Sequence, residues 1–150
     1  GIINDVGEIC ERPISVKNFE GRLLIQKSVF ILNSMGVTPA YEFNMYIRGP
    51  YSSALANDYY KITRTDLKAS GGHIPEEERR VLSEVLLKGT DFTETLSTIM
   101  IMEFENKDLN EDEIAEAVTI MKPRLRNEVE EAYRFLKSAR KKFTISTRAI

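Results

Sequence analysis

The segment 19–35 is apolar in almost every direction around a helical wheel. Its large apolar side chains are those of Phe19, Leu23, Leu24, Ile25, Val29, Phe30, Ile31, Leu32 and Met35. A helix that is apolar all round is buried on most of its sides, so we expect 19–35 to be the central helix of the fold. Asn18 is a suitable N-cap, and Gly36 supplies a stop signal after the last turn.

The next segment, 41–48, alternates between apolar and polar residues, which predicts a short strand. One face of this strand would carry Tyr41, Phe43, Met45 and Ile47. A lone strand leaves its backbone groups unsatisfied. The strand therefore needs a partner, either at 14–16 or near Ile74, unless the segment is only extended chain. Gly49 and Pro50 are expected to end it.

Apolar residues at helical spacing predict shorter helices along the rest of the chain. The predicted ranges are 2–10, 53–62, 76–86, 91–104, 111–121 and 124–143. Asn110 and Glu113 have the spacing of a capping box, and the buried faces of the two helices from 91 to 121 are expected to consist of Phe92, Leu96, Ile99, Met100, Phe104, Ile114, Ala117, Val118 and Met121. The pattern predicts a mostly α, single-domain helical bundle over 1–143, with a small extended or β element that a winged-helix-like arrangement would also explain. Residues 144–150 are expected to be a loose tail.

Composition places the chain among ordinary folded proteins. It has 150 residues, of which 42% are apolar and 29% charged, a balance typical of globular domains. No apolar run is long enough to span a membrane, and no basic segment followed by an apolar run predicts a secretory signal. The single cysteine, Cys10, favours a cytoplasmic location and is expected to be a buried structural thiol.

Charge is unevenly distributed along the chain. The net charge is +1 over 1–72, −9 over 73–121 and +6 over 122–150, which sums to −2. The last of these segments carries a basic cluster at Arg134, Lys137, Arg140, Lys141 and Lys142. This cluster is either a solvated helix face, a contact for nucleic-acid phosphates, or a surface that docks on the acidic middle of another subunit.

Recognised catalytic and cofactor patterns do not occur in the sequence, so we predict no metal and no cofactor. One cysteine and one histidine do not make a zinc site, and there is no phosphate-binding glycine loop or nucleophile elbow. The acidic run 108–113 lacks the spacing of a calcium loop and is better explained as the start of a helix. His73 is expected to be an exposed loop residue rather than a general base.

One constellation of polar and turn residues remains as a candidate site. It consists of Gln26, Lys27, Tyr46, Arg48, Gly49, Pro50, Tyr51 and Ser52. Polar groups on a buried helix need partners. They are therefore expected to satisfy the backbone of the turn, and the alternative is that they line a recognition pocket.

Two strings in this region resemble a known family. The segment 22–32 (RLLIQKSVFIL) and the pattern Y-x-F-x-x-Y-x-x-G-P-Y-S-x-x-L from Tyr41 to Leu55 are similar to those of the YwgA-like family of uncharacterised bacterial and archaeal proteins. A more distant similarity is to Panacea-type antitoxin domains. The chain departs from the pattern at Ser28, where a large apolar residue is usual. The resemblance covers about residues 20–62 and implies a mostly helical prokaryotic protein with a regulatory or defence-related binding function.

Three functional hypotheses follow. The first is a non-enzymatic regulatory or binding module whose partner is a protein or a nucleic acid. The second is a protein-interaction or self-association module, which the charge asymmetry would suit. The third is an enzyme of unrecognised type that uses Tyr46, Arg48, Tyr51 and His73.

Overall fold

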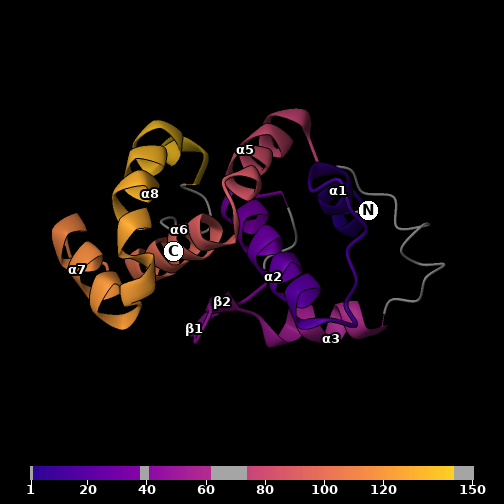
Figure 1. Ribbon diagram of the computed structural model, residues 1–150, viewed down its shortest axis with the longest axis horizontal. Coiled ribbons are helices and arrows are strands. Elements are labelled where there is room, and N and C mark those ends of the chain that lie inside the picture. The colour runs from indigo at the N-terminus through magenta and orange to yellow at the C-terminus, as the bar shows by residue number, and fades with distance from the viewer. Residues whose placement is uncertain (1, 38–40, 62–73, 144–150) are drawn as a thin grey trace.

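The structure is a computed structural model that describes residues 2–37, 41–61 and 74–143. Seven α-helices and one two-stranded antiparallel sheet form these ranges (Figure 1). The helices are α1 (Ile2–Ile9), α2 (Phe19–Ser34), α3 (Ser53–Lys61), α5 (Glu76–Leu87), α6 (Thr90–Glu105), α7 (Glu111–Met121) and α8 (Arg126–Ala139). The strands are β1 (Asn44–Tyr46) and β2 (Gly49–Tyr51). The chain is thus mostly helical with a small β element, as the sequence predicts. None of the described helices is long and apolar enough to cross a bilayer.

Capping residues set the helix boundaries largely as predicted. The Asn18 side chain accepts a 2.6 Å hydrogen bond from the Gly21 amide at the start of α2. Asn110 and Glu113 form the complete capping box that begins α7. Ser52 Oγ accepts from the Leu55 amide at the start of α3. Each of these bonds satisfies a backbone donor that a helix N-terminus would otherwise leave unpaired.

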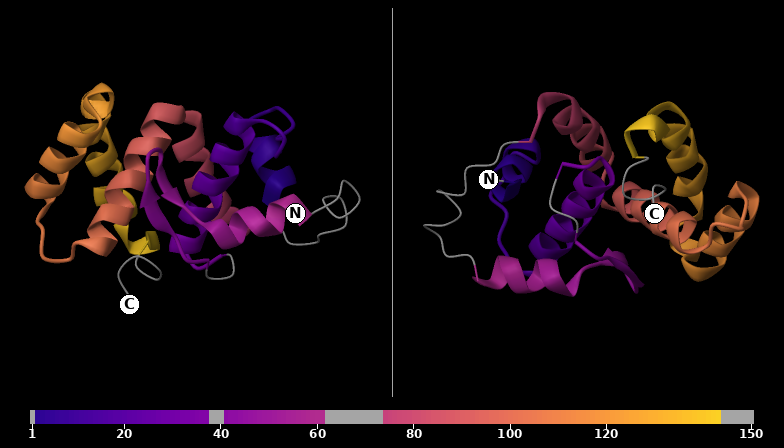
Figure 2. Two further views of the ribbon diagram at one scale, coloured as in Figure 1. Left: turned by 90° about the horizontal axis from the view of Figure 1, so that it is seen from below. Right: turned by 180° about the vertical axis from the view of Figure 1, so that it is seen from behind.

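Helix α6 joins the two parts of the bundle. It contacts α2, α5 and the hairpin on one side and α7 and α8 on the other, as the front and back views show (Figures 1 and 2). Every residue from Phe92 to Met102 is buried. We expected only one apolar face here, so the full burial of α6 is a correction. The helix shares the centre of the fold with α2, whose buried residues run from Ile25 to Ser34.

Hydroxyl side chains explain why α6 can be buried all round. Thr93, Thr95 and Ser97 bond back to carbonyls of the preceding turn, at 2.9, 2.7 and 2.8 Å. A Ser or Thr that bonds its own helix in this way has no need of water. The polar Ser and Thr residues of this segment are therefore compatible with a helix that is buried on all sides.

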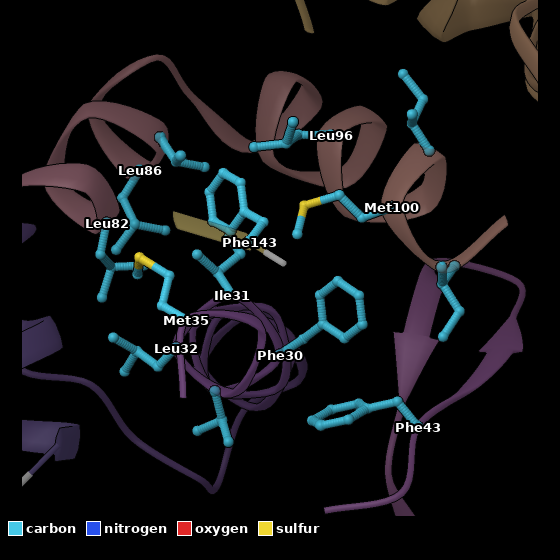
Figure 3. Close-up of a cluster of buried hydrophobic side chains, with 14 of the residues drawn as sticks. Phe30, Ile31, Leu32, Met35, Phe43, Leu82, Leu86, Leu96, Met100 and Phe143 are labelled. Carbon is cyan, nitrogen blue, oxygen red and sulfur yellow. The ribbon is translucent and has the colours of Figure 1, made fainter. Parts of the chain in front are cut away.

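The main core lies where α2, α5 and α6 meet (Figure 3). Ile31 and Leu32 of α2 are fully buried there, and Phe143 fills the space between the three helices. Phe43, which precedes β1, packs edge-on against Phe30 with ring centroids 5.2 Å apart. This contact joins the chain segment leading into the hairpin to the core.

Four predictions of local structure are wrong in detail. The strand covers only Asn44–Tyr46, and its partner is β2 rather than 14–16 or the residues near Ile74. Gly49 and Pro50 therefore continue the sheet instead of ending it, and Ile47 lies at the exposed tip. The expected helix 124–143 is divided into a 3₁₀ turn at Pro123–Leu125, α8, and a second turn at Arg140–Phe143. Met121 is half-exposed rather than part of the buried face of α7.

Candidate functional site

Two adjacent polar residues of α2 hold the second strand of the hairpin. The Gln26 side chain donates to the Ser52 carbonyl at 3.0 Å and accepts from the Ser52 amide at 2.9 Å. Lys27 Nζ donates to the Pro50 carbonyl at 2.9 Å. All these groups are buried. The structure therefore confirms that Gln26 and Lys27 satisfy the backbone of the turn region.

The hairpin crosses α2 and α6 at very short range. Gly49 has φ of +100°, a value that favours glycine. A Cβ added to Gly49 would lie 3.0 Å from Thr98 Oγ1 and 3.1 Å from Lys27 Nζ. Two independent constraints, backbone conformation and available space, thus select glycine at this position.

A buried carboxylate fixes the hairpin from the other side. Glu94 of α6 binds Lys122 Nζ at 2.9 Å and Arg124 at 2.7 Å. Lys122 Nζ also donates to the Ile47 carbonyl at the hairpin tip. We call Glu94, Lys122 and Arg124 the Glu94 ion network. It joins α6, the segment after α7 and the hairpin.

The pKa of Glu94 is lowered by this network. Burial is the largest single influence and raises the pKa, but the hydrogen bonds and charges of Lys122 and Arg124 together outweigh it. A buried carboxylate with two cationic partners remains ionised at neutral pH. Glu94 therefore supplies a fixed negative charge beneath the hairpin.

The hairpin, α2 and α3 enclose a concave apolar site that we call the α2–hairpin groove. Its volume is about 510 Å³, which suits a ligand pocket. Its lining residues are Phe19, Arg22, Leu23, Gln26, Lys27, Tyr46, Ile47, Arg48, Gly49, Tyr51 and Tyr59. The lining contains three basic side chains and no carboxylate. Lys27 is buried and its pKa is lowered to about 7, so Arg22 and Arg48 are the main sources of positive charge in this otherwise apolar groove.

The rim of this groove carries large apolar groups that are exposed to water. Ile47 is 88% exposed, Phe19 56% and Tyr46 51%. The Tyr46 ring contacts the Tyr51 ring edge-on, with centroids 5.2 Å apart. Adjacent exposed apolar residues around a concavity are typical of an interaction site.

Arg48 differs from the other two basic residues of the groove. Arg22 donates a hydrogen bond to the Val16 carbonyl, and the buried Lys27 donates one to the Pro50 carbonyl. The Arg48 side chain is 50% exposed, and its closest carboxylate among the described residues is Glu94, 3.9 Å away. Its guanidinium lies 5.9 Å from the Phe19 ring centroid. Arg48 thus presents a charged donor group at the rim of an apolar site.

A second groove lies on the other side of the row formed by Phe19, Leu23 and Lys27. Its volume is about 540 Å³, and it shares these three residues and Arg48 with the α2–hairpin groove. Its wall includes the carboxylates of Glu20, Asp91 and Glu94 together with Arg12. Its charge is therefore mixed, in contrast to the first groove.

Six of the eight predicted site residues line the α2–hairpin groove, and the other two support it. Pro50 and Ser52 are buried behind the lining and accept the hydrogen bonds from α2. Parts of the two sequence strings that carry the resemblance, within 22–27 and 46–51, form walls of the groove. Ser28, where the sequence departs from the family pattern, is fully buried and its hydroxyl has no partner in the described ranges.

The C-terminal basic residues do not join this site. Arg140 binds Glu103 at 2.8 Å, Lys142 binds Glu77 at 2.8 Å, and Arg134 binds Glu130 at 3.3 Å. Lys137 and Lys141 are exposed. Two of these partners, Glu77 and Glu103, belong to the acidic middle of the same chain. The charge asymmetry is thus partly neutralised within the molecule.

Sequence reasoning missed the residues that complete the site. Glu94 and Lys122 are far from α2 in sequence, so only the tertiary structure shows that they meet at the hairpin. Phe19 is one of the apolar residues of the helix expected at the centre of the fold, and Ile47 lies on the apolar face of the predicted strand, yet both are exposed. Their neighbours give a usable signal, because Phe19 follows the N-cap residue directly and Ile47 lies two residues before a Gly-Pro pair.

The remaining candidate residues contribute little. Cys10 is half-buried rather than fully buried, and burial raises the pKa of its thiol. His73 and the tail 144–150 lie outside the described residues. Within the described ranges, no group of three His, Cys, Asp or Glu side chains has the arrangement of a metal site.

No protein-family model, curated protein or solved structure matches this chain. The resemblance to the YwgA-like family therefore stays a prediction.

We predict that Gly49→Ala destabilises the protein more than Gly89→Ala. Both glycines have positive φ, of +100° and +105°, but a Cβ at Gly89 would contact nothing within 4 Å. Backbone strain of about 1–3 kcal/mol is expected in both variants, with an added steric cost only at position 49. Urea unfolding followed by circular dichroism measures the difference, and equal losses of stability would show that the hairpin does not approach Lys27 and Thr98 closely.

We predict that Lys27 makes the stability of the protein rise with pH between 7 and 10. Burial is the main cause that lowers the pKa of Lys27 from 10.5 to about 7; Lys122 and Arg48 lower it further, and Glu94 opposes them. In this interval the unfolded chain binds more protons at Lys27 than the folded chain, so raising the pH favours folding. Below pH 7 both states are protonated, and the cost of burying the charge is present in full.

The measurement is urea unfolding of the wild type, Lys27→Met and the exposed-site control Lys137→Met at pH 7, 8.5 and 10. The free energy of unfolding of the wild type should rise relative to that of Lys27→Met as the pH increases, whereas Lys137→Met should follow the wild type. A constant difference between wild type and Lys27→Met would contradict the lowered pKa.

Proposed function

We propose that this chain is a non-enzymatic binding module that recognises a segment of a protein partner in the α2–hairpin groove. The main observation behind the proposal is that three exposed apolar side chains, Phe19, Tyr46 and Ile47, line a concave apolar site. Exposing such groups to water is unfavourable, and covering them on binding contributes to affinity.

The construction of the groove supports this function. A rigid interface loses less entropy on binding than a flexible one. The strand that forms one wall is held to α2 by Gln26 and Lys27, and the hairpin tip is held by Lys122 of the Glu94 ion network. Tyr46 and Ile47 are thus carried on an element whose backbone is fixed from two sides, and Phe19 lies on α2 itself.

A protein partner is favoured over a nucleic acid by the charges of the site. The basic residues at the C-terminal end are largely engaged by carboxylates, and of the groove cations only Arg48 is both exposed and without a hydrogen bond in the described ranges. Nucleic-acid binding needs several cations that follow successive phosphates. A regulatory role, as the family resemblance implies, is compatible with such a partner and is part of the proposal.

We predict that Ile47→Asp abolishes peptide binding whereas Ile120→Asp does not. Ile47 and Ile120 are 88% and 70% exposed, so neither substitution disturbs a core, and Ile120 on α7 is not among the residues that line the groove. The wild type is used to select binders from a displayed library of random 12-residue peptides, and each enriched peptide is then tested on both variants by fluorescence anisotropy. Peptides that bind the wild type and Ile120→Asp but not Ile47→Asp would support the proposal.

The opposite results are equally clear. A library with no enriched peptide, or one whose enriched peptides bind Ile47→Asp as well as they bind the wild type, would show that the groove is not a peptide-binding site. Thermal unfolding of both variants, expected to match the wild type, excludes misfolding as the cause.

A further inference from the structure

We infer that the α2–hairpin groove selects peptide segments in which a carboxylate lies beside a large apolar side chain, and that Arg48 binds this carboxylate. The inference rests on the proposed function, because it specifies the chemistry of the segment that the groove would accept.

The first argument for this inference is the charge of the residues that line the groove. Among the lining residues, Arg22, Lys27 and Arg48 are basic, and none is acidic. An anionic group in the partner would therefore enter a site of opposite charge, whereas a basic segment would be repelled. Because the remaining lining is largely apolar, the same partner segment must also present an apolar side chain.

The second argument for this inference is that Arg48 has hydrogen-bond donors that are not used within the described ranges. A guanidinium has five N–H donors in a planar fork that matches a carboxylate. Within the described ranges, Arg48 donates no hydrogen bond to the protein. Its ion pair with Glu94, at 3.9 Å, is longer than a hydrogen bond, and that carboxylate is bound more closely by Lys122 at 2.9 Å and Arg124 at 2.7 Å. Arg48 thus keeps its donors for a group from outside the chain.

The third argument for this inference is the position of Arg48. It lies next to Ile47 at the hairpin tip and close to the Phe19 ring, at 5.9 Å. A carboxylate bound to Arg48 would therefore lie beside the two most exposed apolar groups of the rim. A ligand that fills the groove with an apolar side chain has to place its acidic group within a residue or two of it.

A nucleic acid would also present an anion beside flat rings, but the site suits a peptide better. Arg22 and Lys27 are bound to backbone carbonyls, which leaves Arg48 as the one basic side chain of the described lining without a hydrogen bond, and a chain of phosphates needs a row of cations. The most exposed rim residue, Ile47, is aliphatic and would pack against an apolar side chain of a peptide, whereas Phe19 and Tyr46 offer exposed rings.

The test is a parallel selection of displayed 12-residue peptides on the wild type, Arg48→Glu and the control Arg126→Gln. Arg126 is an exposed arginine at the start of α8 and does not line the groove. Peptides enriched on the wild type and on Arg126→Gln should carry Asp or Glu at a fixed spacing from Phe, Leu, Ile or Trp. Selection on Arg48→Glu should replace this acid by Lys or Arg.

Measured affinities complete the test. For a synthetic fluorescein-labelled peptide from the wild-type selection, changing its acid to the corresponding amide should weaken binding to the wild type about tenfold or more, as expected for a charge-assisted hydrogen bond. The same change should leave binding to Arg48→Gln within about twofold, since the charge it removes would have lost its partner.

The failures are distinguishable. Groove-dependent peptides without an acidic preference, or with equal affinity for Arg48→Glu, would overturn this inference and leave the proposed function intact. Absence of any enriched peptide would overturn both. Binding of a labelled 20-nucleotide oligo(dT) that Arg48→Glu abolishes, with no peptide enriched, would assign the site to nucleic acid and also overturn both.

Discussion

The structure depends on the pairing between one amide side chain of α2 and the backbone of one residue after the hairpin. Gln26 and Ser52 exchange two hydrogen bonds in a region closed to water. Each group would carry a desolvation cost of about 1–3 kcal/mol if it were left unpaired. Because the geometry of the amide matches a single backbone residue, this pairing fixes both the distance and the register between α2 and the hairpin. The groove exists because the two elements are held at this separation.

Charged groups extend the same anchoring to the other side of the hairpin. Lys27 and Glu94 are both buried near Gly49, where each would be costly alone. Lys27 binds the Pro50 carbonyl and lies within electrostatic reach of Glu94, while Glu94 binds Lys122 and Arg124. Every element that carries a rim residue of the groove is thereby connected to α6, the helix that holds the bundle together. A small sheet of two strands, which is marginal on its own, gains a fixed position in this way.

Much of the fold could be predicted from local signals. The N-cap at Asn18 and the capping box at Asn110 and Glu113 involve residues within one helical turn, so the sequence contains all the information that they need. The partners of Gln26 and Lys27 could be predicted too, since buried polar groups on an apolar helix require acceptors and the nearby turn offers them. Prediction was less successful where the same residues fit both an exposed and a buried helix. The hydroxyl residues Thr93, Thr95 and Ser97 of α6 look solvent-facing in sequence, yet they bond to their own helix.

The rest of the site depends on tertiary structure. Nothing local indicates that Glu94 meets Lys122 and Arg124, because these residues are separated by a turn and a complete helix. The exposure of Ile47 follows from the pairing of β1 with β2, which places it at the tip of the hairpin. An alternating pattern predicts which residues share a face of a strand, but not where the strand ends. Whether a rim residue such as Ile47 is buried or exposed therefore depends on where the strand ends.

Hydrogen exchange at the Ser52 amide tests the central claim most directly, because this amide donates to the Gln26 side chain. In the wild type it should be protected. In Gln26→Leu, exchange at Ser52 and at neighbouring hairpin amides should accelerate by about tenfold or more, while the core of α8 around Leu136 keeps its protection. A Ser52 amide that exchanges at the rate of an unstructured peptide in the wild type, or hairpin protection that survives Gln26→Leu, would contradict the account.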